Sequence, residues 1–234
     1  MTRLPALVLV LSLVACAPPA AAPNASPTVP APSTPSAASP TPTTSPSPAG
    51  GAVPKIPDPV AVQLAVKGSA LLVLDITTAV CTPRPSCVAS LSKVAGLLKK
   101  ARDAKVPVIY SLTPTAGSTV LPEVAPQVGE PSVTTRADKF YQTNLDQLLK
   151  DHGVQTAVIV GSASNGAVLY TAFSANLRGY TVVVAQDGIS AEPEFATTLT
   201  RYQLLNQPGF ANADNKPLDP MHVTLSTTDL ITFK

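Results

Sequence analysis

Short apolar runs alternate with helical patterns along residues 55–234, and this alternation constrains the fold more than any other feature of the sequence. Residues 70–74 are all apolar and end at Asp75, as expected of a strand that is buried on both faces. Further strands are predicted at 106–112, 156–160, 180–185 and 223–225, and helices at 88–101, 145–149, 164–178 and 195–205. The order predicts an α/β domain, a three-layer α/β/α sandwich around a mostly parallel, Rossmann-like sheet.

Polar or glycine positions follow three of these predicted strands. Asp75, Gly161 and Asp187 each come directly after an apolar run or close to its end. Ligand sites in open parallel sheets lie beyond the carboxyl ends of the strands, so we expect a site at this edge. Residues 114–132 are rich in proline, glycine and small side chains, and are predicted to form a surface excursion beside that site.

The first residues have the layout of an export signal. Arg3 precedes the apolar run 4–15, which is too short to cross a bilayer, and the run leads through Leu-Val-Ala to Cys16. This ending resembles a bacterial lipobox, which implies a leader at 1–16 and lipidation of Cys16. An ordinary signal peptide with a chance cysteine is the alternative. The expected location is extracytoplasmic, with the protein lipid-anchored to a bacterial membrane.

Residues 17–54 consist mainly of alanine, proline, serine and threonine and carry no charged side chain. Such a segment buries too little apolar surface to offset its chain entropy. We therefore expect a disordered stalk between the anchor and a single folded domain at 55–234.

The amino-acid composition limits the kinds of molecule that this domain is expected to bind. The whole chain has a net charge of only +2, lacks tryptophan and has no basic cluster, so nucleic acid is not an expected partner. After Cys16, two cysteines remain, Cys81 and Cys87; an oxidising compartment favours a disulfide between them, and two free thiols are the alternative. The only histidines are His152 and His222, and neither lies near the cysteines, so no metal or cofactor is predicted.

Three segments, taken in order, resemble the isochorismatase-like, or cysteine hydrolase, superfamily. They are LVLD ending at Asp75, RADKF with its Lys139 followed by Thr143 at the start of a helix, and GSASNGAVLYTA at residues 161–172. The resemblance covers residues 67–232. The interval between Lys139 and Thr143 is only four residues, which is shorter than in many members of the superfamily.

The resemblance assigns an aspartate, a lysine and a cysteine as the catalytic set, at Asp75, Lys139 and Ala167. The aspartate would exchange protons, the lysine would stabilise charge, and backbone N–H groups of the helix start would bind a developing oxyanion. Because Ala167 has no nucleophilic atom, covalent thioester chemistry is excluded at this position. Ser164 is expected to cap the helix rather than to replace the thiol. Asn165 and Gly166 are the candidate ligand-binding residues beside it.

Two kinds of function remain open. True isochorismatases lack the cysteine and use the aspartate as an acid, so the resemblance implies non-thiol hydrolysis of a small molecule, with Asp75 as general acid and Lys139 beside it. The alternative is an inactive pseudo-hydrolase that binds a small carboxylate or amide, or a plain interaction domain. A small-molecule ligand, the membrane through the lipid anchor and association into a homo-oligomer are the expected partners.

Overall fold

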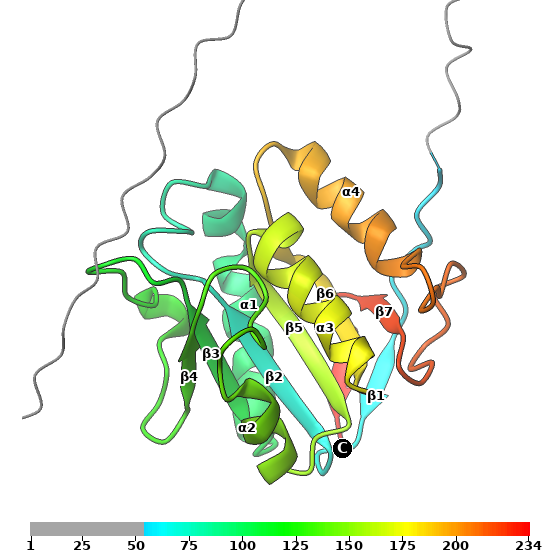
Figure 1. The fold of residues 1–234 in the computed structure, drawn as a ribbon, viewed down its shortest axis with the longest axis horizontal. Helices are drawn as coiled ribbons and strands as arrows, with labels where there is room; N and C mark the ends of the chain where they lie inside the picture. Colours follow the sequence, from blue (N-terminus) through cyan, green and yellow to red (C-terminus); the bar gives the residue numbers. More distant parts are fainter. Residues whose placement is uncertain (1–53) are drawn as a thin grey trace, which may run out of the picture. The chain divides into compact units, whose positions relative to one another are not determined.

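The computed structural model describes residues 54–234, which form a parallel sheet covered by helices on both faces (Figure 1). The predicted leader, the lipidation site Cys16 and the predicted stalk up to residue 53 lie outside the described residues. None of the helices within 54–234 combines the length and apolar character that crossing a membrane requires.

Six parallel strands make up the main sheet and confirm the predicted fold class. Their spatial order is β4 (Ser132–Thr134), β3 (Val108–Leu112), β2 (Ser69–Leu74), β5 (Thr156–Ser162), β6 (Thr181–Ser190) and β7 (Val223–Ser226). A separate parallel pair joins β1 (Val62–Leu64) to β8 (Ile231–Phe233) near the two ends of the described region. Of these strands, β1, β4 and β8 were not predicted.

The helices form one layer on each side of the sheet. Leu71 and Val73 of β2 face a core shared with α1 (Pro85–Asp103), whereas Leu72 and Leu74 face the opposite core. That second core is covered by α2 (Leu145–Asp151), α3 (Leu169–Leu177) and α4 (Glu194–Leu205) (Figure 1). The side-chain period of two along β2 therefore separates two apolar layers, which explains why its residues are all apolar.

The strand order reverses between β2 and β5, and a glycine allows the two strands to approach there. Gly161 pairs with Leu74, and a Cβ at Gly161 would lie only 2.2 Å from the Leu74 carbonyl oxygen. Its φ of +147° is also rare for residues with a side chain. Crevices at such a reversal are the usual ligand sites of open parallel sheets, so the fold directs attention to the ends of these two strands.

Two local predictions were wrong. Strand β6 does not end before Asp187 but continues to Ser190, because Ile189 and Ser190 pair with Gly161 and Ser162 beyond an irregularity in the β5–β6 register. The predicted helix 164–178 is divided into a π-helical turn η2 (Ser164–Val168) followed by α3.

Ser164 does not cap this helix. Ala163 occupies the N-cap position without a side-chain hydrogen bond, and the buried Ser164 hydroxyl lies 3.4 Å from the Thr197 hydroxyl of α4. The predicted excursion 114–132 does leave the sheet, and it contains the short 3₁₀ helix η1 (Pro122–Val124). It also contributes Pro114 and Thr115 to the cavity described below.

Candidate active site

Asp75 begins the site at the point where β2 ends. Its φ is +53°, a conformation that aspartate tolerates better than most residues, and its N–H donates to the Ser111 carbonyl oxygen at 3.1 Å. One carboxylate oxygen accepts a 2.8 Å hydrogen bond from the Ser111 hydroxyl, and the other lies 2.6 Å from Lys139 Nζ. Only 2% of Asp75 is exposed. The carboxylate is thus fixed from two sides in a nearly water-free position.

Lys139 contacts Asp75 from the interior of the protein and does not itself line the cavity. The residue is fully buried, and its ammonium group also donates to the carbonyl oxygens of Thr135 and Arg136. With Asp75, these acceptors account for all three protons of the ammonium group. Thr143 holds the same short loop by donating to the Lys139 carbonyl oxygen at 2.6 Å. Lys139 therefore supplies a fixed charge beside Asp75 and has no donor left for a substrate.

Burial sets the protonation behaviour of Asp75. Removal from water raises the pKa of the Asp75 carboxyl above its ordinary value, and the charge and hydrogen bond of Lys139, together with the bond from Ser111, oppose this rise only in part. A carboxyl with a raised pKa retains its proton at a higher pH, as a general acid must.

The π-helical turn after β5 forms the facing wall. Gly166 and Val168 donate their N–H groups to the Ala163 carbonyl oxygen at 3.1 and 3.3 Å. Ala167 lies between them in this turn and lines the cavity described next. The Ala167 side chain is a methyl group that is 4% exposed. The turn therefore offers no nucleophile at this position.

A cavity of about 500 Å³ joins the two walls. Asp75, Gly166 and Ala167 all line it, so the structure brings three of the residues predicted from sequence to one space. The volume falls within the range of roughly 300–1,000 Å³ that is usual for small-molecule sites.

Other predicted residues lie elsewhere. Asn165 is exposed and does not line the cavity. Asp187 points to a different region, where its carboxylate accepts hydrogen bonds from the N–H and hydroxyl of Thr228 and lies 3.7 Å from Lys93 Nζ. Within residues 54–234, no group of three or more histidine, cysteine, aspartate or glutamate side chains is arranged to hold a metal.

Two cationic residues of the cavity were not anticipated as site residues. Arg84 and Arg136 both line it, one from the loop before α1 and the other from the loop that holds Lys139. A partly exposed arginine on a loop has no distinctive sequence pattern, and only the folded arrangement shows that the two share a cavity.

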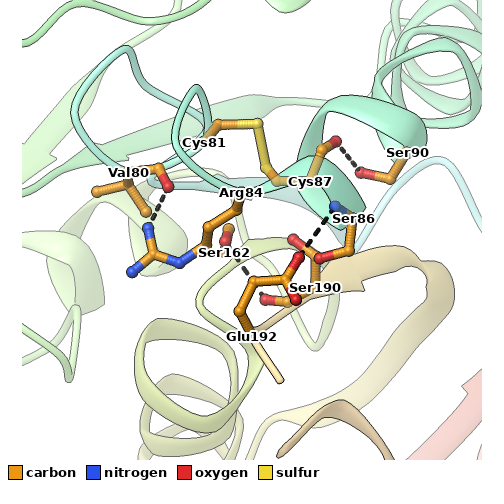
Figure 2. The surroundings of a disulfide bond; sticks show 9 residues. All are labelled: Val80, Cys81, Arg84, Ser86, Cys87, Ser90, Ser162, Ser190 and Glu192. Carbon is orange, nitrogen blue, oxygen red and sulfur yellow. Dashed lines mark hydrogen bonds between the residues drawn. A yellow bond between two sulfur atoms is a disulfide. The ribbon is translucent and has the colours of Figure 1, made fainter. Parts of the chain in front are cut away.

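A disulfide closes the loop that carries Arg84. Cys81 and Cys87 are bonded, with their Cα atoms 5.3 Å apart, and both are buried. Figure 2 shows the Arg84 side chain extending from this loop toward the Val80 carbonyl oxygen, to which it donates. The structure thus adopts the bonded alternative, and the bridge restrains one rim of the cavity.

The parallel sheet with helices on both faces and a cavity at its strand reversal defines a three-layer α/β protein. The model of the isochorismatase domain matches residues 69–203, which is more than half of the chain. The chain therefore belongs to the isochorismatase family.

Individual relatives are more distant. A secreted isochorismatase effector, Isc1, of Verticillium dahliae is 31% identical over 113 residues, which cover 43% of this chain and 60% of the fungal protein. Maleamate amidohydrolase of Pseudomonas putida is 28% identical over 149 residues, which cover 50% of this chain and 70% of that enzyme. The chain thus matches less than two thirds of the first of these proteins.

Solved structures support the same fold. An isochorismatase family protein from Burkholderia thailandensis superposes with a TM-score of 0.61 at 23% identity, over 73% of this chain and 96% of that one. N-carbamoylsarcosine amidase from Thermoplasma acidophilum gives a TM-score of 0.55 at 22% identity, over 69% and 96% of the two chains. At these identities the likeness establishes the architecture alone.

Proposed function

We propose that this protein hydrolyses a small molecule by acid catalysis without a covalent intermediate, with Asp75 as the general acid. The observation that carries the proposal is the state of Asp75: it lines an open cavity, yet it is almost fully buried and its pKa is raised. Lys139 acts as a positioning residue, since its three hydrogen bonds hold the carboxylate in place and none is directed at the cavity.

The chemistry that suits this arrangement is hydrolysis of a vinyl ether or a similarly acid-labile bond. Protonated Asp75 transfers its proton to the vinyl carbon, which leaves an oxocarbenium ion. Water adds to this cation, and the proton that the water loses returns to the Asp75 carboxylate. The resulting hemiketal breaks into a carbonyl compound and an alcohol, so one water is consumed and the acid is regenerated. The position of Gly166 and Ala167 in the cavity lining supports the proposal, because a helix start favours negative charge that develops on a substrate oxygen.

Ala167 favours a second candidate, a pseudo-hydrolase that binds a small carboxylate or amide without turnover. Amide hydrolysis through a covalent intermediate needs a nucleophile at this position, and the methyl group provides none. Asp75 and the other residues that line the cavity would then serve as ligand contacts only.

We further propose that the protein acts outside the cytoplasm, held at a membrane through Cys16. The buried disulfide and the likeness to a secreted fungal relative support an oxidising location. The anchor rests on the sequence of residues 1–16 alone.

Turnover assays on the full-length protein test the main proposal. A panel of small vinyl ethers and amides is screened with the wild type, Asp75→Asn and, as a matched control, Asp187→Asn. Loss of a general acid is expected to lower kcat by about 10²–10⁴-fold in Asp75→Asn, with Asp187→Asn close to wild type. Turnover that survives Asp75→Asn would refute the mechanism, and ligand binding without any turnover would favour the pseudo-hydrolase.

Restoring the thiol gives a complementary test. In Ala167→Cys the sulfur would lie at a helix start, where the local field favours the thiolate. We expect this variant to gain amidase activity that the wild type lacks, measured as ammonia release. A folded variant without such a gain would indicate that the cavity no longer supports the family's chemistry.

A further inference from the structure

The cavity beside Asp75 carries an excess of positive charge. Arg84 and Arg136 line it, and Asp75 is the single acidic residue among the described residues that do so. The charge of Asp75 is already balanced by Lys139 at 2.6 Å. A ligand that enters the cavity therefore meets two cations whose charge is not neutralised inside it.

Within residues 54–234 neither arginine forms an ion pair, although the charge of Arg84 is felt by Glu192, whose pKa is lowered by hydrogen bonds with Ser86 and also by this charge. Across the described part of the chain, ion pairs involve Arg102 with Glu130 and Arg201 with Glu194, but not Arg84 or Arg136. Glu192, the acidic residue near Arg84, is exposed, lies outside the cavity lining and accepts the Ser86 N–H at 3.2 Å. The two guanidinium groups remain available to an anion from outside.

Arg84 is held more firmly than an ordinary surface arginine. Its N–H donates to the Cys81 carbonyl oxygen at 2.8 Å, and its carbonyl oxygen accepts the Cys87 N–H at 3.0 Å, so its backbone is bonded to both cysteines of the bridge. Its side chain is half-buried and donates once, to Val80. A guanidinium has five N–H donors, so most of its hydrogen-bonding capacity is unused.

Arg136 approaches from the opposite loop, and its backbone is also fixed. Its carbonyl oxygen accepts a hydrogen bond from Lys139, the same lysine that holds Asp75. Small side chains such as Ala79, Ala137 and Ala163 also line the cavity. They leave room for a compact ligand in the cavity of about 500 Å³.

We propose that this cavity selects a small substrate that carries a carboxylate, that Arg84 and Arg136 bind this carboxylate, and that the Cys81–Cys87 disulfide positions Arg84 for the contact. Planar guanidinium groups suit a carboxylate because two parallel N–H donors can bind both oxygens. The inference rests on the proposed function, because it requires that the substrate occupies the Asp75 cavity. It makes the two arginines specificity-determining residues and the disulfide a positioning device.

Calorimetric titration of the full-length protein with matched probes tests the specificity. Benzoate and succinate are compared with benzamide and succinamide, which have similar shapes but no charge. We expect the carboxylates to bind more tightly than their amides, and Arg84→Gln and Arg136→Gln each to weaken carboxylate binding by about 10- to 100-fold. Arg201→Gln removes the same charge away from the cavity and should leave binding unchanged. Equal binding of acids and amides, or no binding of either carboxylate, would overturn the proposal.

The role of the disulfide needs a separate comparison. Reduction of the wild type is expected to weaken benzoate binding by less than Arg84→Gln does. Arg84→Lys keeps the positive charge but loses the two parallel N–H donors of the guanidinium, so its affinity for benzoate should fall between those of the wild type and Arg84→Gln. In Arg84→Gln itself, reduction should cause no further loss, because the group that the bridge positions is already absent. An equal effect of reduction on the wild type and on Arg84→Gln would contradict the positioning role.

The outcomes also separate this inference from the acid mechanism. Arginine-dependent carboxylate binding in a protein without turnover would support the anion site and contradict only the catalytic proposal. Turnover that depends on Asp75 but is indifferent to both arginines would support the acid and overturn the anion site.

Discussion

Asp75 and Asp187 are two aspartates at the same edge of one sheet, and each lies beside a lysine. The surroundings differ. The Asp75 side chain is almost fully buried, and its carboxylate lies 2.6 Å from Nζ of Lys139, which has no exposed surface. The Asp187 side chain is 17% exposed, and its carboxylate lies 3.7 Å from Nζ of Lys93, which is 55% exposed. Asp75 lines the cavity at the strand reversal, whereas Asp187 holds Thr228 through two hydrogen bonds.

The difference shows that a position near the carboxyl edge of the sheet does not define the chemistry of a carboxylate. What distinguishes Asp75 is that backbone carbonyl groups, not water, surround its lysine partner. In such an environment the charges interact strongly and desolvation alters proton affinity, whereas near water both effects are weak. Four variants or conditions test this contrast, from the largest expected effect to the smallest.

Removing the lysine beside each aspartate should give the largest difference in stability between the two regions. Lys139→Met leaves the buried Asp75 carboxylate without compensation, so we expect the free energy of unfolding to fall by about 3–5 kcal/mol. Lys93→Met breaks an exposed pair and should change it by less than about 0.5 kcal/mol. Urea unfolding of both variants measures the difference. Similar losses in the two variants would show that burial of the first pair is not what strengthens it.

Removing the disulfide should have an intermediate effect. The Cys81–Cys87 bridge closes a short loop on the Asp75 side of α1, and replacing both cysteines by alanine is expected to lower the free energy of unfolding by about 2 kcal/mol. Wild-type protein unfolded in a reducing buffer should show a similar loss, and the double variant should be insensitive to the reductant. A double variant that is still destabilised by the reductant would show that another group responds to it.

The pH dependence of stability should depend on Asp75. Because burial raises its folded pKa above the unfolded value, its contribution is fully present below about pH 4, the ordinary pKa, and is lost as the pH rises through the folded pKa. The advantage of the wild type over Asp75→Asn should therefore shrink as the pH increases, by about 1.4 kcal/mol per pH unit while the folded group still holds its proton. Urea titrations from pH 4 to 8 measure this difference. An advantage that grows with pH would mean that Lys139 lowers the pKa more than burial raises it.

The smallest effect is expected at Asp187. Asp187→Ala removes the acceptor of the Thr228 N–H and hydroxyl, and because the Asp187 side chain is 17% exposed, so that water can replace part of the lost contact, the loss should be about 1 kcal/mol. Thermal unfolding is the measurement, with turnover expected to stay at the wild-type level. A large loss of activity would place Asp187 in the site after all.

The local pattern of apolar residues in the sequence was sufficient to predict most of the strands and helices. Period and composition predicted the buried strand before Asp75, whose side chains meet apolar cores on both faces, and the helices, which each bury one apolar face. The pattern failed beyond residue 185, where Asp187 and Gly188 look like a turn. Pairing with Gly161 and Ser162 keeps this stretch extended, and that pairing is a tertiary contact. The capping role expected for Ser164 failed for a similar reason, because α4 offers Thr197 as a neighbour.

The site was predictable only in part. Asp75 and Lys139 are 64 positions apart, and the resemblance to a known family, rather than spacing, brought them together. Arg84 and Arg136 carry no sequence signal because each is an ordinary loop cation until the fold places it at the cavity. Asn165 was expected at the site but lies on the surface, because the π-helical turn changes which side chains face inward.

The complete enclosure of Lys139 has a practical consequence. Reagents that acetylate or otherwise modify amines need contact with the free, unprotonated nitrogen, and here the ammonium is held by three oxygens and has no exposed surface. Its labelling must await an opening of the structure around Asp75. The rate at which Lys139 is modified, read by mass spectrometry against exposed lysines such as Lys99, would therefore report how often this part of the native protein opens.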